Sequence, residues 1–81
     1  MNQQEIFVLV KEIFNRLVTD KIEVTILTSS REVSRWDSLT HVMFIAEIEK
    51  TFGIRFDIFE MLEMRNIGDI CTNVERLVKA K

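Results

Sequence analysis

The chain has 81 residues, of which 47% are hydrophobic and 30% charged, with a formal net charge of −2, no proline and two glycines. This length allows one small domain that buries about 60–65% of its unfolded surface, and the composition is typical of a folded helical protein rather than a disordered one. One cysteine excludes an internal disulfide, and Cys71 together with the single histidine, His41, cannot supply the usual ligand set of a zinc site.

The first predicted helix covers about residues 3–18. Its apolar residues recur at spacings of three and four, the period of a helix face packed on a core; they are Ile6, Leu9, Val10, Ile13, Phe14 and Leu17. The period ends there, and residues 20–36 read as a long ordered loop, a kind of connection that is often functional. Four apolar residues are expected to pin this loop to the bundle: Ile26, Leu27, Val33 and Trp36.

A second helix is predicted over about residues 38–52. Asp37 precedes it as an N-cap, because its carboxylate can accept a hydrogen bond from the free N–H groups of the first turn. Gly53 follows it as a left-handed C-cap. The apolar residues of this helix form a broad face, made of Leu39, Val42, Phe44, Ile45, Ile48 and Phe52.

Two further helices complete the chain. Asp57 and Glu60 have the spacing of a capping box, which predicts a short helix ending at about Met64. The residues Asn66-Ile67-Gly68-Asp69 repeat this capping pattern, which predicts a last helix ending at about Lys79. Its expected buried residues are Ile67, Ile70, Val74, Leu77 and Val78. The sequence therefore predicts an all-α four-helix bundle with a long first loop and a short third helix, forming a single domain over residues 1–81.

Ser38 occupies the first position of the second helix, where its hydroxyl is expected to be exposed beside the positive end of the helix dipole. A phosphate esterified to that oxygen would meet unpaired N–H groups and a favourable field. Leu39 lies too early in the helix to be well covered. An exposed leucine beside an exposed serine indicates a docking surface around a modifiable hydroxyl.

The triplet Asp37-Ser38-Leu39 resembles the attachment site of acyl carrier proteins, in which a serine carries a 4'-phosphopantetheine arm. The resemblance extends along nearly the whole chain, because a helix and a long loop precede the triplet, Phe52-Gly53-Ile54 closes its helix, and a short helix and a final helix follow. It implies a stand-alone carrier rather than an enzyme, with the cofactor on Ser38 and with Asp37 and Leu39 beside it.

The resemblance also implies the partners. A phosphopantetheinyl transferase would attach the arm, and an acyl- or aminoacyl-loading ligase, synthases and transferases would use it for fatty-acid, polyketide or related biosynthesis. Partners of this family bind the second and third helices, where the matching surface is Leu39, Val42, Met43, Ala46, Glu49 and Ile58.

The chain departs from the fatty-acid carriers near this motif. Thr40 and Met43 stand where those carriers usually have acidic residues, and Ser34-Arg35-Trp36 replaces the usual Leu-Gly. These differences favour a specialised carrier of a polyketide, a modified acyl chain or a single amino acid.

Several residues allow two interpretations. Four residues can either pack in the core or line an acyl pocket that opens on loading; they are Phe56, Phe59, Met61 and Met64. Trp36 is interpreted as a loop anchor rather than a contact of the arm, and His41 as a surface histidine rather than a ligand of the arm's phosphate. Cys71 is expected to be a buried small hydrophobe without a redox role.

Charge and hydropathy limit the other partners. Residues 37–64 carry six acidic and two basic side chains, against five of each in residues 1–36. With no basic patch interleaved with aromatic residues, nucleic-acid binding is not expected. The longest apolar run, Ile6 to Val10, is far shorter than the roughly 20 residues of a membrane span. The first residues lack the basic charge of a secretory signal, so we expect a cytoplasmic protein. We also expect it to be a monomer.

Two alternatives from other classes compete with the carrier. The first is a carrier-like bundle that is never modified and only binds a partner protein. It stays open because Thr40 and Met43 replace acidic residues of the surface that fatty-acid carriers present beside the serine. A small hydrolase using Ser38 and His41 is disfavoured, because the chain has no Gly-x-Ser-x-Gly elbow.

Overall fold

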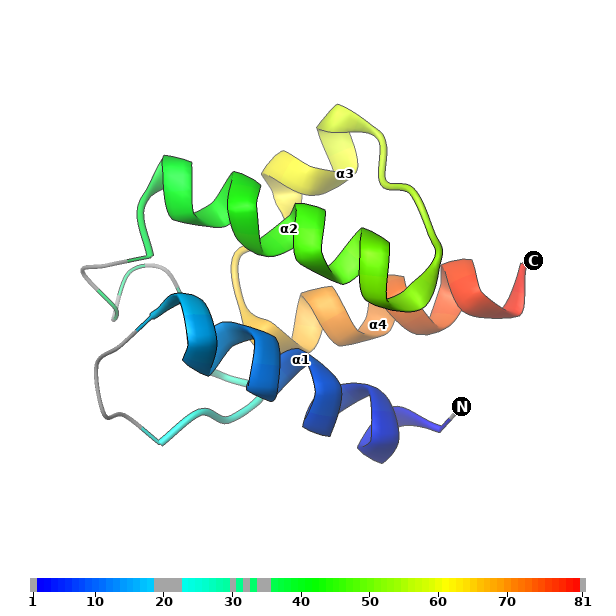
Figure 1. Ribbon diagram of the computed structural model, residues 1–81, viewed down its shortest axis with the longest axis horizontal. Coiled ribbons are helices and arrows are strands. Elements are labelled where there is room, and N and C mark those ends of the chain that lie inside the picture. Colours follow the sequence, from blue (N-terminus) through cyan, green and yellow to red (C-terminus); the bar gives the residue numbers. More distant parts are fainter. Residues whose placement is uncertain (1, 19–22, 30, 32, 34–35, 81) are drawn as a thin grey trace.

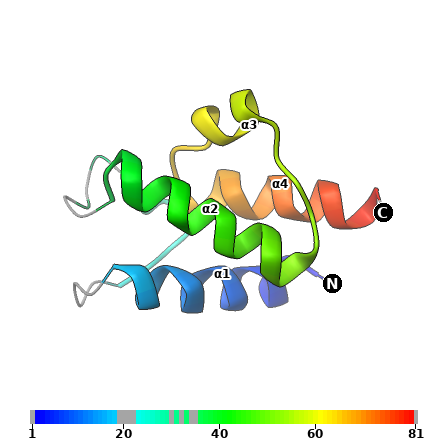
Figure 2. The same ribbon diagram turned by 45° about the horizontal axis from the view of Figure 1, so that its top comes forward.

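In the part of the chain that it describes, a computed structural model shows four helices, α1 (Gln3–Leu17), α2 (Ser38–Phe52), α3 (Ile58–Glu63) and α4 (Ile67–Lys79). The structure describes residues 2–18, 23–29, 31, 33 and 36–80. The three long helices, α1, α2 and α4, pack together, while the short α3 lies on the side of α2 away from α1 (Figures 1 and 2). The predicted four-helix bundle, including its short third helix, is confirmed.

The core forms where the apolar faces of the three long helices meet. The buried side chains of these helices are Ile6, Val10, Ile13, Phe14, Phe44, Ile45, Ile48, Phe52, Ile67, Ile70, Cys71 and Val74. Leu9, Leu17, Leu77 and Val78 pack against this cluster but are only partly buried. The helical periods seen in the sequence therefore identify most of the core, and the exceptions lie at its margins.

An aromatic cluster closes the core near the start of α2. Trp36 packs edge-on against Phe14 and Phe44, with ring centroids 5.2 Å and 5.8 Å away, and Phe14 packs edge-on against Phe44 at 5.5 Å. Such pairs stabilise a fold by about 0.5–1.5 kcal/mol each beyond the burial of their surface. Trp36 is thus a loop anchor, as its sequence position suggested.

The predicted helix caps are present. Asp37 Oδ1 accepts the N–H of Thr40 at 2.9 Å, and Asn66 Oδ1 accepts the N–H of Asp69 at 2.7 Å. Asp57 and Glu60 form the full capping box at the start of α3. Each of these three helices therefore begins directly after the residue whose side chain accepts a hydrogen bond from its free backbone donors.

The loop before α2 is pinned by different residues from those predicted. Val33 and Trp36 are buried as expected, but Ile26 and Leu27 are 58% and 75% exposed, so their assignment as loop anchors is wrong. They are the central residues of a turn that the Thr28 N–H closes by donating to the Thr25 carbonyl at 3.1 Å. The buried residues of this segment are instead Val24, just before the turn, and Thr28, its last residue.

The same turn attaches to α4 through its backbone. The Ile26 carbonyl accepts the N–H of Gly68 at 2.8 Å, and the Thr28 carbonyl accepts the N–H of Ile67 at 3.0 Å. These donors belong to the first turn of α4 and have no acceptor within the helix. A Cβ at position 68 would lie 3.0 Å from the Ile26 oxygen, so glycine permits this close approach.

Gly53 ends α2 in the left-handed region, with φ 65° and ψ 41°. A side chain in this conformation costs about 1–2 kcal/mol, while asparagine tolerates it better than other residues. We expect Gly53→Ala to lower the free energy of unfolding by about 1 kcal/mol or more, and Gly53→Asn to lower it less. Urea unfolding followed by circular dichroism measures both, and an alanine variant as stable as the wild type would refute this account of the helix end.

Candidate functional site

Ser38 is the first residue of α2, and its side chain is exposed. The preceding Asp37 fixes this helix start through its hydrogen bond to Thr40. Hydrogen bonding, above all from the Thr40 backbone N–H, lowers the pKa of the Asp37 carboxyl below its ordinary value of 3.8. The cap is therefore ionised at neutral pH. Its contribution to stability is present above pH 3.8 and is lost as the pH falls through the lowered value.

A hollow of about 470 Å³ lies beside Ser38. The loop before α2, the first turns of α2, and α3 with the segment after it all contribute to its wall. The lining residues are Arg31, Trp36, Asp37, Ser38, His41, Val42, Met61, Leu62, Met64 and Arg65. A mostly apolar wall next to an exposed hydroxyl is suited to hold a group attached at that hydroxyl.

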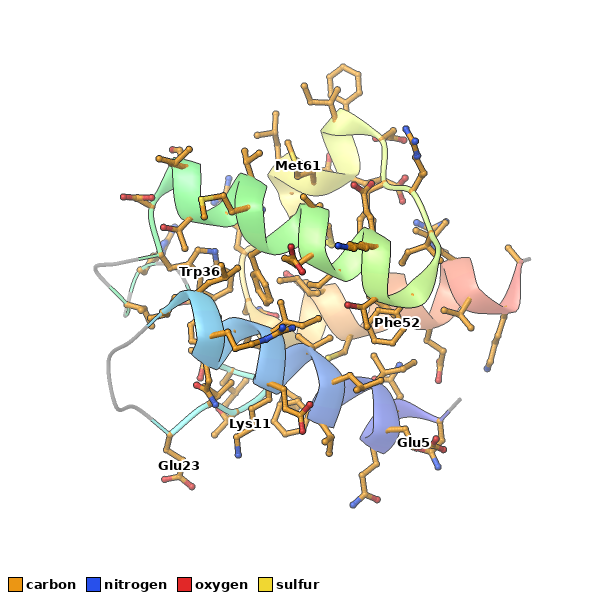
Figure 3. All side chains as sticks on the ribbon, viewed as in Figure 1. Glu5, Lys11, Glu23, Trp36, Phe52 and Met61 are labelled. Atoms are coloured by element: carbon orange, nitrogen blue, oxygen red, sulfur yellow. The ribbon has the colours of Figure 1, made fainter. Side chains whose placement is uncertain are left out.

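His41 joins three segments at this hollow. The indole N–H of Trp36 donates to His41 Nδ1 at 3.0 Å, and His41 Nε2 lies 2.8 Å from the Met61 carbonyl oxygen of α3. Because an indole can only donate, Nδ1 must accept, and the proton of a neutral imidazole then sits on Nε2 and is donated to Met61. The Trp36 and His41 rings also stack, with centroids 5.9 Å apart. Figure 3 shows Trp36 between the start of α2 and the end of α1.

The interpretation of His41 as a plain surface histidine is therefore wrong. Its side chain is half-buried, and both ring nitrogens have partners. The sequence placed it one helical turn after Ser38, but its partners are a loop indole and a backbone carbonyl. Neither partner leaves a signal in the spacing of residues.

Polar links hold α3 on the bundle. None of its residues is buried. Besides the His41–Met61 bond, Glu60 pairs with Arg76 of α4, and Glu49 of α2 accepts the N–H of Phe56 at 2.8 Å just before α3 begins. Met61 also packs against the core but stays partly exposed. With few buried apolar contacts, the short helix has the kind of attachment that allows local opening.

The surface beside Ser38 is apolar. Leu39, Val42, Met43, Ala46 and Ile58, from the predicted partner surface, are all exposed, whereas Glu49 is half-buried and bonded to Phe56. Two residues that the partner prediction did not include, Phe59 and Leu62, are exposed at 74% and 61%. A six-residue helix cannot cover all its apolar side chains, and that shortness was the available signal.

Two of the four residues considered for core or pocket lie at the hollow. Met61 and Met64 line it, and Met64 is buried. Phe56 is half-buried and packs against the core. Phe59 does not line the hollow and is mostly exposed, so its assignment to the core is wrong.

Three further observations concern the thiol, metal binding and membrane spans. Cys71 is buried in α4, and burial raises the pKa of its thiol to about 11. Among the residues that the structure describes, no three His, Cys, Asp or Glu side chains are grouped so as to hold a metal ion. Within that same part of the chain, no helix is both long and apolar enough to cross a membrane.

The chain is similar to known proteins in sequence and in fold. A family model described as "Phosphopantetheine attachment site" matches residues 9–74. The holo acyl carrier protein of Geobacter metallireducens, solved by NMR, has a similar structure, with a TM-score of 0.82, 28% identity, and coverage of 91% of this chain and 86% of that one.

A second solved structure shares the fold. It is a proposed acyl carrier protein of Mycobacterium tuberculosis, with a TM-score of 0.81, 20% identity, and coverage of 88% of this chain and 96% of that one. A comparison with curated protein sequences gives no significant match.

The bridge through His41 makes a prediction. We expect His41→Ala to lower the free energy of unfolding by about 1–3 kcal/mol, because the Trp36 indole loses its acceptor and the Met61 carbonyl loses its donor. The indole N–H resonance of this single tryptophan should also shift. Urea unfolding and ¹⁵N-edited NMR measure the two effects. Lys50→Ala, an exposed change on the same helix, is the control, and an unmoved indole resonance in His41→Ala would contradict the hydrogen bond.

Proposed function

The chain belongs to the phosphopantetheine-attachment family, and from this premise we propose that Ser38 bears the arm and that the protein presents thioesters to biosynthetic enzymes. It is an acyl carrier protein with covalently attached 4'-phosphopantetheine, and not itself an enzyme. The terminal thiol of the arm supplies the chemistry, since a thioester there keeps an acyl group attached yet reactive. We take residues 1–81 as a single carrier domain.

The observation that carries the assignment of Ser38 is its place on the molecule. It is exposed, it starts a long helix held in the core, and it opens on the hollow. A transferase can reach such a hydroxyl, and the N–H groups of the first helical turn favour a phosphate there. The residues present therefore fit the group.

The neighbours of Ser38 have separate roles in this proposal. Asp37 holds the helix start in one conformation, so the hydroxyl is presented at a fixed position. Leu39, 70% exposed, is a contact for visiting enzymes. Met61 and Met64 line the hollow, where flexible thioether side chains can adapt to a cargo.

The docking surface supports a specialised carrier rather than the housekeeping carrier of fatty-acid synthesis. Of the acidic residues on and near α2 and α3, Glu60 is paired with Arg76, which offsets its charge, and Glu49 accepts the backbone N–H of Phe56, so both carboxylates are engaged within the bundle. The exposed apolar side chains dominate beside Ser38. We propose that partner enzymes, whether acyl or aminoacyl transferases and synthases, recognise this surface through apolar contacts.

Loading by a broad-specificity phosphopantetheinyl transferase with coenzyme A tests the proposal directly. The intact mass of the wild type should increase by one phosphopantetheine, and Ser38→Ala should show no gain. Ser29→Ala, a change at another serine of the chain, is the matched control and should load like the wild type. A folded wild-type protein that gains no mass would leave the unmodified interaction module as the better account, since the exposed apolar surface would still need a partner.

Thiol reactivity provides a second prediction. Cys71 is buried and its thiol pKa is raised to about 11, so at pH 8 it is protonated and inaccessible in the folded protein. We expect the apo protein to react only slowly with Ellman's reagent, and the transferase-treated protein to show one rapid equivalent. Unfolding in guanidinium should expose one additional thiol in both forms. A rapid equivalent in the folded apo protein would contradict the burial of Cys71.

A further inference from the structure

Two arginines lie on the hollow beside Ser38. Arg31 comes from the loop before α2 and Arg65 from the segment between α3 and α4, so they approach from two different parts of the chain. Both side chains are exposed. Among the described residues, neither guanidinium is joined to a carboxylate by an ion pair, and the contact made by Arg65 with Asp69 is through its backbone N–H.

The remaining wall of the hollow carries little charge. Apart from the two arginines, the described lining consists of Ser38, Asp37, His41, whose Nδ1 accepts from the Trp36 indole, and apolar side chains. Among the described residues of the lining, Asp37 is the one carboxylate, and it is engaged with the N–H of Thr40. The lining residues that the structure describes therefore carry two positive charges and one negative charge before any modification.

Esterification of Ser38 changes this balance. A phosphodiester adds one negative charge at the serine, next to Asp37, and the two arginines then match the two anions. Guanidinium groups bind phosphate and carboxylate oxygens with paired, charge-assisted hydrogen bonds. Without such cations, the phosphodiester and the Asp37 carboxylate would stand side by side as like charges.

We propose that Arg31 and Arg65 form an anion site on the rim of the hollow, which holds a negatively charged group of the loaded arm. The proposal rests on the attachment at Ser38. The charge balance favours the phosphodiester as the group held, and a carboxylate at the end of the cargo has the same chemistry. Holding either group turns the arm toward the apolar wall rather than out into solvent.

The test compares four states of the protein: unmodified, or loaded from coenzyme A, butyryl-coenzyme A or succinyl-coenzyme A. Butyryl and succinyl cargoes have the same carbon chain length and differ by the terminal carboxylate. Each state is prepared for the wild type, for Arg31→Gln/Arg65→Gln, and for Arg55→Gln. Arg55 is exposed and does not line the hollow, so it is the matched control. Intact mass establishes complete loading before any other measurement.

The readouts are the thermal unfolding midpoint and the ³¹P resonance of the single phosphodiester. Loading should raise the unfolding midpoint of the wild type and of Arg55→Gln by about 1–5 °C more than it raises the midpoint of the Arg31→Gln/Arg65→Gln double variant. This extra gain should shrink as salt increases. The ³¹P resonance should differ between the wild type and the double variant if the phosphodiester is held. A gain seen only with the succinyl cargo would identify the carboxylate instead.

The outcomes separate the two proposals. Complete loading of Ser38 with equal midpoints and equal ³¹P resonances in the wild type and the double variant overturns the anion site and leaves the carrier function intact. Failure of the wild type to load overturns both. The two arginine side chains are exposed, so the unmodified double variant is expected to fold, and its circular dichroism spectrum verifies this.

Discussion

Burial of Trp36 determines where α2 begins and therefore where Ser38 stands. The indole is 3% exposed, it packs edge-on against Phe14 of α1 and Phe44 of α2, and its N–H donates to His41. The chain leaves the core immediately afterwards, and Asp37 caps the helix on the next residue. A fixed tryptophan followed by a cap leaves the serine exposed at one defined place, which is what a covalent attachment site requires.

The second consequence of this arrangement concerns α3. The bond network that starts at Trp36 continues through His41 to the Met61 carbonyl, so the loop, α2 and α3 are connected across the hollow. α3 has no fully buried residue; its Met61 packs against the core from a partly buried position, and Glu60 and the segment before the helix supply further attachments. Helices attached in this way open at lower free energy than a core helix does. Local opening of α3 would enlarge the hollow, because α3 supplies part of its wall, while the core residues of the three long helices lie outside that wall.

Much of the fold was predictable from the sequence, because helix periods and caps are local signals. The apolar spacing of α1 and α4, the capping residues Asp37, Asp57 and Asn66, and Gly53 as a C-cap all correspond to the structure. Ser38 at the first turn of α2 follows from the same local chemistry.

The errors arose where tertiary contacts decide the outcome. Ile26 and Leu27 are exposed because the loop attaches to α4 through its backbone carbonyls. A backbone contact of this kind leaves no recognisable pattern in the amino-acid sequence. Phe59 is exposed because α3 is too short to bury every apolar residue it carries. The role of His41 depends on partners that are close in space but carry no motif, and the approach of Arg31 and Arg65 to one hollow depends on the path of the whole chain.

The central claim is that Ser38 bears the arm in the working protein. The most direct measurement is peptide fragmentation by tandem mass spectrometry on the protein isolated from the cells that produce it, which assigns the modification to a single residue. The account predicts phosphopantetheine on the peptide containing Ser38, with the fragment ions placing it on that serine. Peptides in which Ser38 is unmodified throughout, or in which another serine carries the group, would contradict it.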